Sequence, residues 1–205
     1  MIPVRSLPLT GLLALAFHLA LAGSSAAIPV VWEVGAGGNG HTYEVVVVGS
    51  PILWADARAA AQAKGPGWDL ASLTSLEESD FVKSLFSGDP SAFVDPSLCV
   101  GSNCPGPWLG GLDVNGATNF LWLSGEPVTF TDWAAGEPAA NGDVIAYGDF
   151  SAPNGGTGIA WNDFPGDVLR QDTPISYVAE LVPEPSTFLL LATGLLGFTK
   201  LRPRR

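Results

Sequence analysis

The second half of the sequence is a series of short apolar and aromatic stretches, each bounded by turn residues. From residue 107 onward these stretches are PWLGGLDV, FLWLSG, VTFTDW, DVIAYGDF, GIAWNDF and ISYVAELV. Runs of this length that are rich in β-branched and aromatic residues predict strands. The chain is therefore expected to fold around many short strands, and no internal repeat is visible among them.

A strand pattern and a helical pattern come earlier in the chain. HTYEVVVV at residues 41–48 has the composition of a strand. In ILWADARAAAQAK, the residues Trp54, Ala57 and Ala61 recur at helical spacing and form one apolar face, and Gly-Pro-Gly at 65–67 ends the pattern.

A second helix is predicted to begin near residue 75, with Phe81 and Leu85 on its buried side. Two overlapping capping boxes open it: Thr74 with Glu77, and Ser75 with Glu78. Two helices combined with many short strands indicate an α+β domain.

Two segments have the composition of loops. Residues 28–40 run into GAGGNG, which predicts a flexible lead-in. Residues 87–107 are rich in Gly, Pro and Ser and contain Cys99 and Cys104, so they also predict a loop.

Residues 1–27 have the pattern of a secretory signal peptide. An early cation, Arg5, precedes a short apolar run and then a series of small residues. Cleavage sites at residues 20–22 and 25–27 place the start of the mature chain near Gly23 or Ile28. An uncleaved membrane helix is the alternative, although the apolar run is short and interrupted by Pro8 and Gly11.

The C-terminal end, VPEPSTFLLLATGLLGFTKLRPRR, joins an apolar run to a cluster of cations. The run at 186–199 has 14 residues, which as a helix reach about 21 Å, short of a hydrocarbon core of about 30 Å. The flanking cations can keep their charge in the interface and favour a cytoplasmic end. The segment is therefore a marginal membrane span.

Three parts of this end resemble the PEP-CTERM sorting signal of Gram-negative bacteria. In order they are Pro183-Glu184-Pro185, the short apolar helix, and the final cluster with Arg202, Arg204 and Arg205. The resemblance covers residues 183–205 and implies export, attachment to the membrane through the C-terminal helix, and cleavage by an exosortase-like enzyme. The expected location is the cell envelope or the extracellular space. A plain C-terminal anchor is the alternative and shares the membrane step.

The segment between the two targeting regions is strongly acidic. Residues 28–182 contain four Lys and Arg residues against nineteen Asp and Glu, a net charge of −15. Such a surface repels phosphate backbones, so nucleic acid is not an expected partner. Divalent cations, and sugars bridged by them, remain compatible with this charge.

Cys99 and Cys104 enclose the short sequence VGSN. Exported proteins form disulfides, so these two cysteines are expected to be joined. Metal binding by the pair is the weaker alternative, because no histidine lies nearby.

Several stretches resemble a C-type lectin-like domain and occur in that family's order over about residues 41–182. WADARAAAQA and DLASLTSLEESDFV resemble its paired helices, and WLGGL resembles its Trp-Ile-Gly-Leu signature. LWLSGEPVTFTDWAAGEP resembles its Trp-x-x-Gly-x-Pro-x-x-Phe-x-x-Trp run, WND matches its late motif, and YVAELV stands where its last strand pairs with its first. The resemblance implies a C-type lectin-like fold with two helices, short antiparallel sheets and a long loop region.

The chain departs from animal members of that family in its cysteines. Their two long-range disulfides are absent, and Cys99 with Cys104 is a different, local pair. Stability is therefore expected from the core, to which the bulky contributors are Trp54, Trp108, Trp122, Trp133 and Trp161.

The resemblance also implies a calcium site that binds sugar. In calcium-binding members, a Glu-Pro-Asn motif, a later carboxylate and the Asn and Asp of Trp-Asn-Asp hold the ion, and two vicinal sugar hydroxyls complete the shell. The corresponding candidate residues here are Glu137, Asn141, Asp143, Asn162 and Asp163. Of these, Glu137, Asn141 and Asn162 are also the candidate sugar ligands, because amides donate hydrogen bonds to hydroxyls.

One position of that site is altered, because Ala139 stands where the motif has Asn. Asn141 would have to replace the missing amide, and a shift of one residue would put Gly142 in the place of Asp143. The same residues also fit a site without metal, in which Asn162 and Asp163 form local turns and Pro138 keeps a cis turn. The sequence leaves three alternatives: a working calcium site, a degraded one, or an acidic loop.

Two functions follow from these patterns. The first is a carbohydrate-binding module that recognises exopolysaccharide or other surface glycans, with calcium as cofactor. The second is a calcium-free structural or protein-binding component of an extracellular matrix. Catalysis is not expected, because His41 lies far from Cys99 in sequence and nothing singles out one carboxylate among many.

Overall fold

The computed structural model describes residues 25–26, 28–99, 103–150 and 158–183. Most of the expected signal peptide (residues 1–24 and 27) lies outside the described residues, as do Glu184, Pro185, Arg202, Arg204 and Arg205 of the sorting signal. Among the described residues, no helix is long and apolar enough to span a membrane. The predicted C-terminal helix at 186–199 lies outside that part of the chain.

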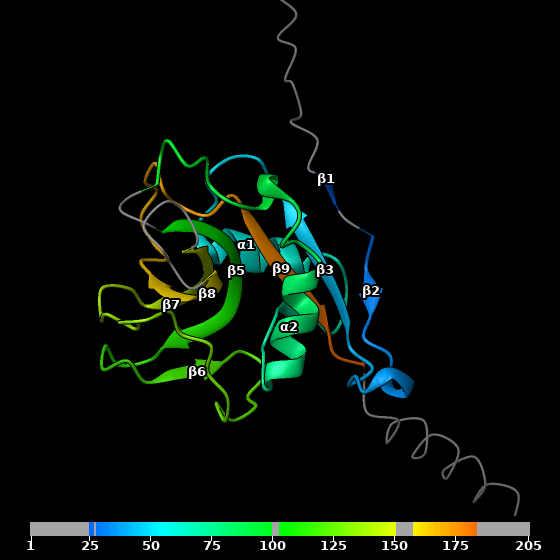
Figure 1. The fold of residues 1–205 in the computed structure, drawn as a ribbon. Coiled ribbons are helices and arrows are strands. Elements are labelled where there is room, and N and C mark those ends of the chain that lie inside the picture. The colour runs from blue at the N-terminus through cyan, green and yellow to red at the C-terminus, as the bar shows by residue number, and fades with distance from the viewer. Residues whose placement is uncertain (1–24, 27, 100–102, 151–157, 184–205) are drawn as a thin grey trace, which may run out of the picture.

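The domain is an α+β fold built on one extended sheet (Figure 1). Its strands are β1 Ser25–Ala26, β2 Val30–Val31, β3 Thr42–Val47, β4 Trp68–Leu70, β5 Cys104–Asp113, β6 Phe120–Trp122, β7 Val144–Asp149, β8 Ile159–Phe164 and β9 Ser176–Leu181. Its helices are α1 Trp54–Gln62 and α2 Leu76–Ser84, with short 3-10 helices η1 Val34–Ala36 and η2 Pro90–Ala92. The predicted fold class is confirmed.

The last strand lies at the centre of the sheet, next to the first long strand. The strand order is β1-β3-β9-β5-β7-β8, and β2, β4 and β6 pair with β3, β9 and β5. The antiparallel pairing of β3 with β9 runs from Thr42 opposite Leu181 to Val47 opposite Ser176. The expectation that YVAELV pairs with the first strand is therefore confirmed.

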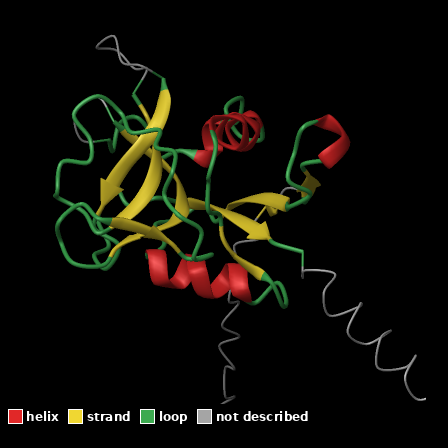
Figure 2. Ribbon diagram, turned by 90° about the horizontal axis from the view of Figure 1, so that it is seen from below, coloured by secondary structure: helices red, strands yellow, loops and turns green. Residues whose placement is uncertain are grey.

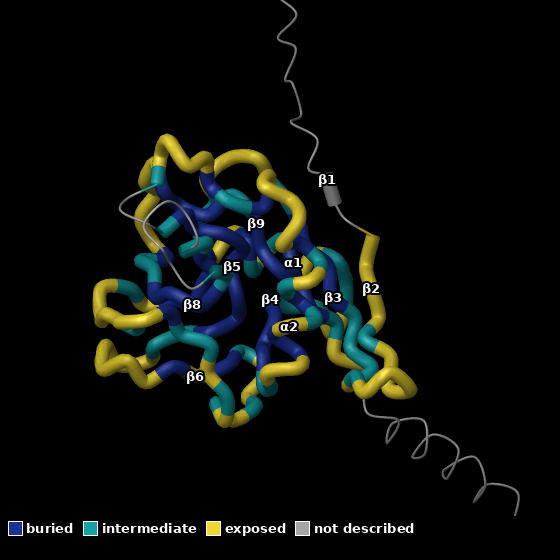
Figure 3. Tube along the Cα trace, in the orientation of Figure 1, coloured by how far each residue is buried: buried dark blue, intermediate teal, exposed yellow. Residues whose placement is uncertain are grey.

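The two helices lie on opposite sides of the strands, as Figure 2 shows. Side chains alternate across β3, so Tyr43 and Val45 belong to the core under α2, whereas Val46 belongs to the core under α1. On the α1 side, Trp54, Ala57 and Ala61 are buried as predicted. Each helix therefore covers its own layer of apolar side chains, and Figure 3 shows β5 and β9 buried between the layers.

The core on the α2 side is centred on Trp161, which is 0% exposed. The rings of Trp122, Phe130 and Trp133 meet it edge-on, with centroid distances of 5.4, 5.4 and 5.7 Å. Edge-to-face aromatic contacts of this kind add to the free energy of burial. The expected aromatic core is present, and Trp54 and Trp108 provide its counterpart on the α1 side.

Helix α2 begins as predicted, and its buried face includes more residues than predicted. Ser75 is the N-cap, and its Oγ accepts a hydrogen bond from the Glu78 backbone N–H at 3.1 Å. The fully buried side chains of the helix are Glu78, Ser79 and Val82, whereas Phe81 and Leu85 are half-buried at its margin. Phe81 and Leu85 do pack against the core, and the innermost position is held by an acidic residue, Glu78, whose carboxylate accepts hydrogen bonds from several donors.

Part of the predicted loop at 87–107 belongs to a central strand. Pro105 and Pro107 lie within β5, where the pairing with β7 shifts register between Pro105 and Trp108. A residue without an N–H fits such an irregularity better than a regular ladder. Conversely, VTFTDW at 128–133 was predicted to be a strand but is an irregular segment. Its backbone pairing is limited to a single bridge between Trp133 and Trp161, although Phe130 still packs on the core.

The segment at 28–40 is more structured than its glycines predict. Val30 and Val31 form β2, which pairs with β3. Trp32 stacks on Phe81 of α2 with ring centroids 5.5 Å apart. A side chain at Gly38 would place its Cβ 2.3 Å from the Trp32 carbonyl oxygen. These contacts attach the segment to the body of the domain.

Candidate functional site

Four of the five predicted metal ligands line one cavity of about 530 Å³. They are Glu137, Asn141, Asn162 and Asp163. Asn162 and Asp163 are delivered by β8, and the other two by the loop at 134–142. Asn103, Arg170 and Asp172 also line the cavity, so a cation stands among its acidic and amide groups.

Asp163 holds the loop in place. Its side chain is 1% exposed, and its two oxygens accept hydrogen bonds from the backbone N–H groups of Ala139, Asn141 and Gly142 at 2.9, 3.0 and 2.9 Å. At Gly142 the loop presses against β8, because a Cβ there would lie 2.3 Å from the Phe164 nitrogen. The Asp163 carboxylate therefore acts as the structural acceptor for this loop.

Three other oxygens of the cavity lack a partner: Asn103 Oδ1, Glu137 Oε2 and Asn162 Oδ1. All three are buried and make no hydrogen bond among the described residues. Glu137 precedes Pro138 through a cis peptide bond. Burial and the adjacent Asp163 carboxylate raise the pKa of Glu137. Buried acceptors without donors are costly, so a cation or a donor at this position would stabilise the site.

Asp143 is not part of this arrangement. It is exposed, it does not line the cavity, and its Oδ1 accepts a hydrogen bond from the Gly166 N–H at 2.8 Å. Asp143 precedes β7 and Asp163 lies within β8, and of the two only Asp163 lines the cavity. Asp143 therefore lies apart from the other four predicted ligands, and its carboxylate joins the start of β7 to the segment after β8.

The residues present fit a weak calcium site better than a strong one. Calcium prefers about six to eight oxygen ligands. Glu137 and Asn162 each offer an unpaired oxygen, while Asp163 already accepts three N–H groups and Ala139 offers no side-chain oxygen. An ion held here would take the rest of its shell from water or from ligand hydroxyls.

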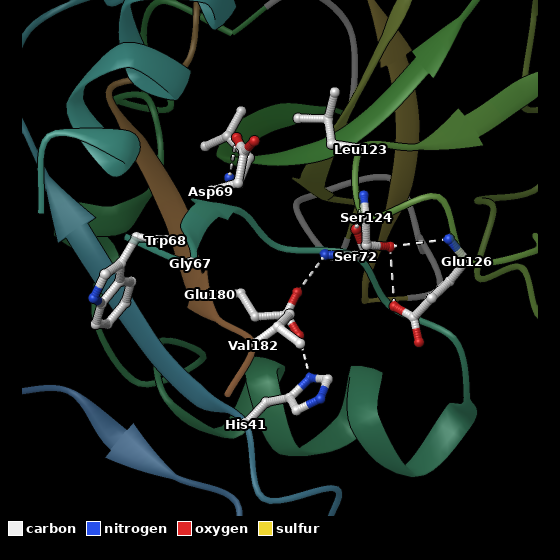
Figure 4. Close-up of a pocket in the computed structure, with 11 residues that line it drawn as sticks. His41, Gly67, Trp68, Asp69, Ser72, Leu123, Ser124, Glu126, Glu180 and Val182 are labelled. Carbon is white, nitrogen blue, oxygen red and sulfur yellow. Dashed lines mark hydrogen bonds and ion pairs between the residues drawn. The ribbon is translucent and has the colours of Figure 1, made fainter. Parts of the chain in front are cut away.

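A second cluster of polar groups, not predicted from the sequence, lies at the opposite end of β9. The ligating atoms of His41, Glu78 and Glu180 lie within 4.8 Å of one another, and both carboxylates are 2% exposed. His41 and Glu180 also line a cavity of about 430 Å³ (Figure 4). His41 is the first residue of the predicted strand at 41–48, and its partner Glu180 is 139 residues away.

Each oxygen of the two carboxylates has a donor. Glu180 Oε1 lies 2.6 Å from His41 Nδ1, and Glu180 Oε2 accepts from the Ser72 N–H at 2.9 Å (Figure 4). Glu78 Oε1 accepts from Asn39 Nδ2 at 2.8 Å and from the Tyr43 hydroxyl. Glu78 Oε2 accepts from the Thr74 N–H. The cluster is therefore a satisfied structural network that joins β3, α2 and β9.

This network makes the stability of the domain depend on pH. The hydrogen bond to Glu180 is the main cause that raises the pKa of His41, and burial acts against it. The folded state thus holds this proton more tightly than the unfolded state. The stability that His41 adds is complete below its ordinary pKa of 6.5 and is lost as the pH rises through the folded value.

We therefore expect the urea midpoint of wild type to fall as the pH rises above 6.5. His41→Gln removes the titrating group and should flatten the profile in this window. Urea unfolding at constant ionic strength over a pH series measures both. Parallel profiles for the two proteins would show that His41 is not the source of the dependence.

The two cysteines form the expected disulfide. Their sulfur atoms are 2.19 Å apart, and no free cysteine remains. Cys104 is the first residue of β5, and its neighbour Asn103 lines the cavity with Glu137. The disulfide therefore lies close to the candidate site.

Comparison with known proteins gives one match at the C-terminus and several over the domain. Residues 181–205 match the family model described as the PEP-CTERM protein-sorting motif. The chain is 30% identical over 135 residues to the type-2 ice-structuring protein of Osmerus mordax, covering 64% of this chain and 66% of that protein. It is 29% identical over 129 residues to a lectin of Pleurodeles waltl, covering 60% of this chain and 67% of the lectin. The matches thus span about two thirds of these relatives.

Among solved structures, the C-type lectin CEL-I from Cucumaria echinata superposes on 70% of this chain and 91% of its own, with a TM-score of 0.51 and 22% identity. At this identity the likeness concerns the fold.

Proposed function

Because the chain has a C-type lectin-like fold and ends in a PEP-CTERM sorting motif, we propose that it is an exported, surface-sorted carbohydrate-binding module. Its ligand in this proposal is an exopolysaccharide or another surface glycan. The signal peptide at 1–27 directs export, the C-terminal helix attaches the chain to the membrane, and an exosortase-like enzyme processes the segment at 183–205. The domain that remains would act in the cell envelope or outside the cell.

The observation that carries the proposal is that two of the predicted ligands, Glu137 and Asn162, each have a buried, unpaired oxygen in the larger cavity. Glu137 Oε2 and Asn162 Oδ1 would each be satisfied by one calcium ion. Calcium would supply a positive charge against the Glu137 and Asp163 carboxylates and would present open positions to two vicinal hydroxyls of a sugar. The Asn141 and Asn162 amides would donate hydrogen bonds to those hydroxyls and fix the orientation of the sugar.

A second candidate function is a calcium-free structural or protein-binding component of a surface matrix. The favouring observation is that three backbone N–H groups already occupy the Asp163 oxygens, which are a main part of the expected ion shell. The relatives include a lectin and an ice-structuring protein. The relatives therefore do not decide between the two functions. The decision depends on whether the unpaired oxygens of the candidate site bind calcium.

Both candidates are binding functions, and we propose no catalysis. His41 is held by Glu180 within a satisfied network. In the described part of the chain, no serine, threonine or cysteine side chain is hydrogen-bonded to His41 as a nucleophile would be.

Calcium is expected to raise the thermal midpoint of wild type by a few degrees. Stabilisation by a ligand follows RT ln(1 + [L]/Kd), or about 2.7 kcal/mol when calcium is a hundredfold above its Kd. Glu137→Gln removes one charge and one ligand oxygen and should abolish the shift. Ala139→Asn adds an amide oxygen and should enlarge it. Thermal melts of the three proteins in calcium and in chelator test this.

Comparison of the three proteins distinguishes a working calcium site from a lost one and from a calcium-free function. Identical melts of all three in both conditions would contradict calcium binding and favour the matrix function. A response from Ala139→Asn alone would show that this one substitution removed the site. Magnesium at the same concentration is the control for a general effect of divalent cations on an acidic chain.

A further inference from the structure

One end of the sheet carries apolar side chains at the point where the chain leaves the domain. Val31 on β2 pairs with Thr42 on β3, Thr42 pairs with Leu181 on β9, and Leu181 pairs with Trp68 on β4. These four residues form a row across the sheet. Figure 1 shows β9 ending beside η1 and β2. We give the name exit end to four apolar residues at this end of the sheet. They are Val31 and Trp68 of the row, Val34 of η1, and Val182, which follows β9.

The apolar side chains of the exit end are accessible. Val31, Val34 and Val182 are 43%, 68% and 37% exposed, and Trp68 is half-buried. Single exposed apolar residues are ordinary on a protein surface. This set differs because it gathers at one end of the sheet and includes a tryptophan, whose ring suits the boundary between water and an apolar phase.

The length of chain beyond the exit end limits how far it can lie from a membrane. The last described residue is Pro183, and the apolar run begins at Ser186. Three extended residues span at most about 10 Å. While that run is in a membrane, the exit end must therefore lie next to the lipid surface.

We propose that the exit end rests on the lipid surface while the chain is anchored, and that this contact turns the candidate site away from the membrane. Arg170 and Asp172 line the larger cavity just before β9 begins, and β9 then runs through six residues, or about 20 Å, to the exit end. The inference rests on the anchoring step of the proposed function.

The contact is apolar and not electrostatic. Lys64 lies over the Trp68 ring, and its Nζ is paired with Glu44 at 2.8 Å. Glu33, between Val31 and Val34, is exposed and acidic. Zwitterionic lipid therefore suffices for the contact, and anionic lipid should not strengthen it.

The test places a thiol-reactive fluorophore on the full chain reconstituted in phosphatidylcholine vesicles, in the variants Val34→Cys and Val168→Cys. The native cysteines are joined in a disulfide and do not react. Val168 is 49% exposed and lies just before Arg170, at the opposite end of β9, so it is a matched control. Quenching is measured with bromine-labelled lipid and with aqueous iodide, after flotation has shown that the chain is bound.

The expected result at residue 34 is about a twofold loss of emission with the lipid quencher and protection from iodide, as for a side chain in the interfacial region. The label at residue 168 should respond to iodide only. Equal responses of the two labels in floating vesicles would overturn the inference alone. Protection of residue 34 from iodide without lipid quenching would also overturn it, and would indicate a second copy of the chain on this face. Failure to float would contradict the anchoring step and the inference together.

Discussion

Asp163→Ala is expected to lower the unfolding free energy by about 3 kcal/mol, since three N–H groups lose a charged acceptor at once. The groups belong to Ala139, Asn141 and Gly142, and all three distances to the Asp163 oxygens are 3.0 Å or less. The loss should also release the loop that places Glu137. Urea unfolding measures the stability.

Asp143→Ala is the matched control for Asp163→Ala. Both residues were candidate ligands on sequence grounds, but Asp143 is exposed and accepts one N–H, that of Gly166. Its loss should cost about 1 kcal/mol or less. Equal destabilisation by the two variants would contradict the assignment of Asp163 as the acceptor that holds the loop.

Glu78→Ala is expected to have a similar effect, on the order of 3 kcal/mol, because several donors lose a buried, charged acceptor at once. The donors are Asn39 Nδ2, the Tyr43 hydroxyl, and the N–H and hydroxyl of Thr74. Relief of repulsion between Glu78 and Glu180 offsets part of this loss. Urea unfolding near pH 7 gives the magnitude.

Glu77→Ala is the control for Glu78→Ala. It removes the same group from the same helical turn, but the Glu77 side chain is exposed. Surface changes of this kind stay within about 0.5 kcal/mol. If both variants were equally stable, the network around Glu78 would not contribute to the stability of the domain.

The sequence predicted most of the fold where a local pattern and burial agree. The β-branched run at 41–48 is a strand, and Ser75 with Glu78 opens α2. The pattern failed at VTFTDW, because a segment can bury aromatic side chains such as Phe130 without pairing its backbone. It also missed β4, whose three residues are strand only because β9 lies beside them.

Part of the candidate site was also predicted, because local sequence motifs identify some of its residues. Glu137, Asn162 and Asp163 follow recognisable local motifs, and the structure brings them to one cavity. Asp143 stands just before β7, whereas Asp163 lies within β8 opposite Ile145, and the sequence alone does not give that register. The partnership of His41 with Glu180 joins residues 139 positions apart and has no local signal.

The most direct test of carbohydrate binding is retention of the purified domain on a panel of immobilised polysaccharides, in calcium and in chelator. Wild type should be retained on at least one polysaccharide in calcium. Chelator, or Glu137→Gln in calcium, should weaken retention at least about tenfold, the equivalent of about 1.4 kcal/mol of binding free energy. A folded wild type that binds no polysaccharide, or binds equally with calcium and with chelator, would contradict a calcium-dependent carbohydrate-binding function.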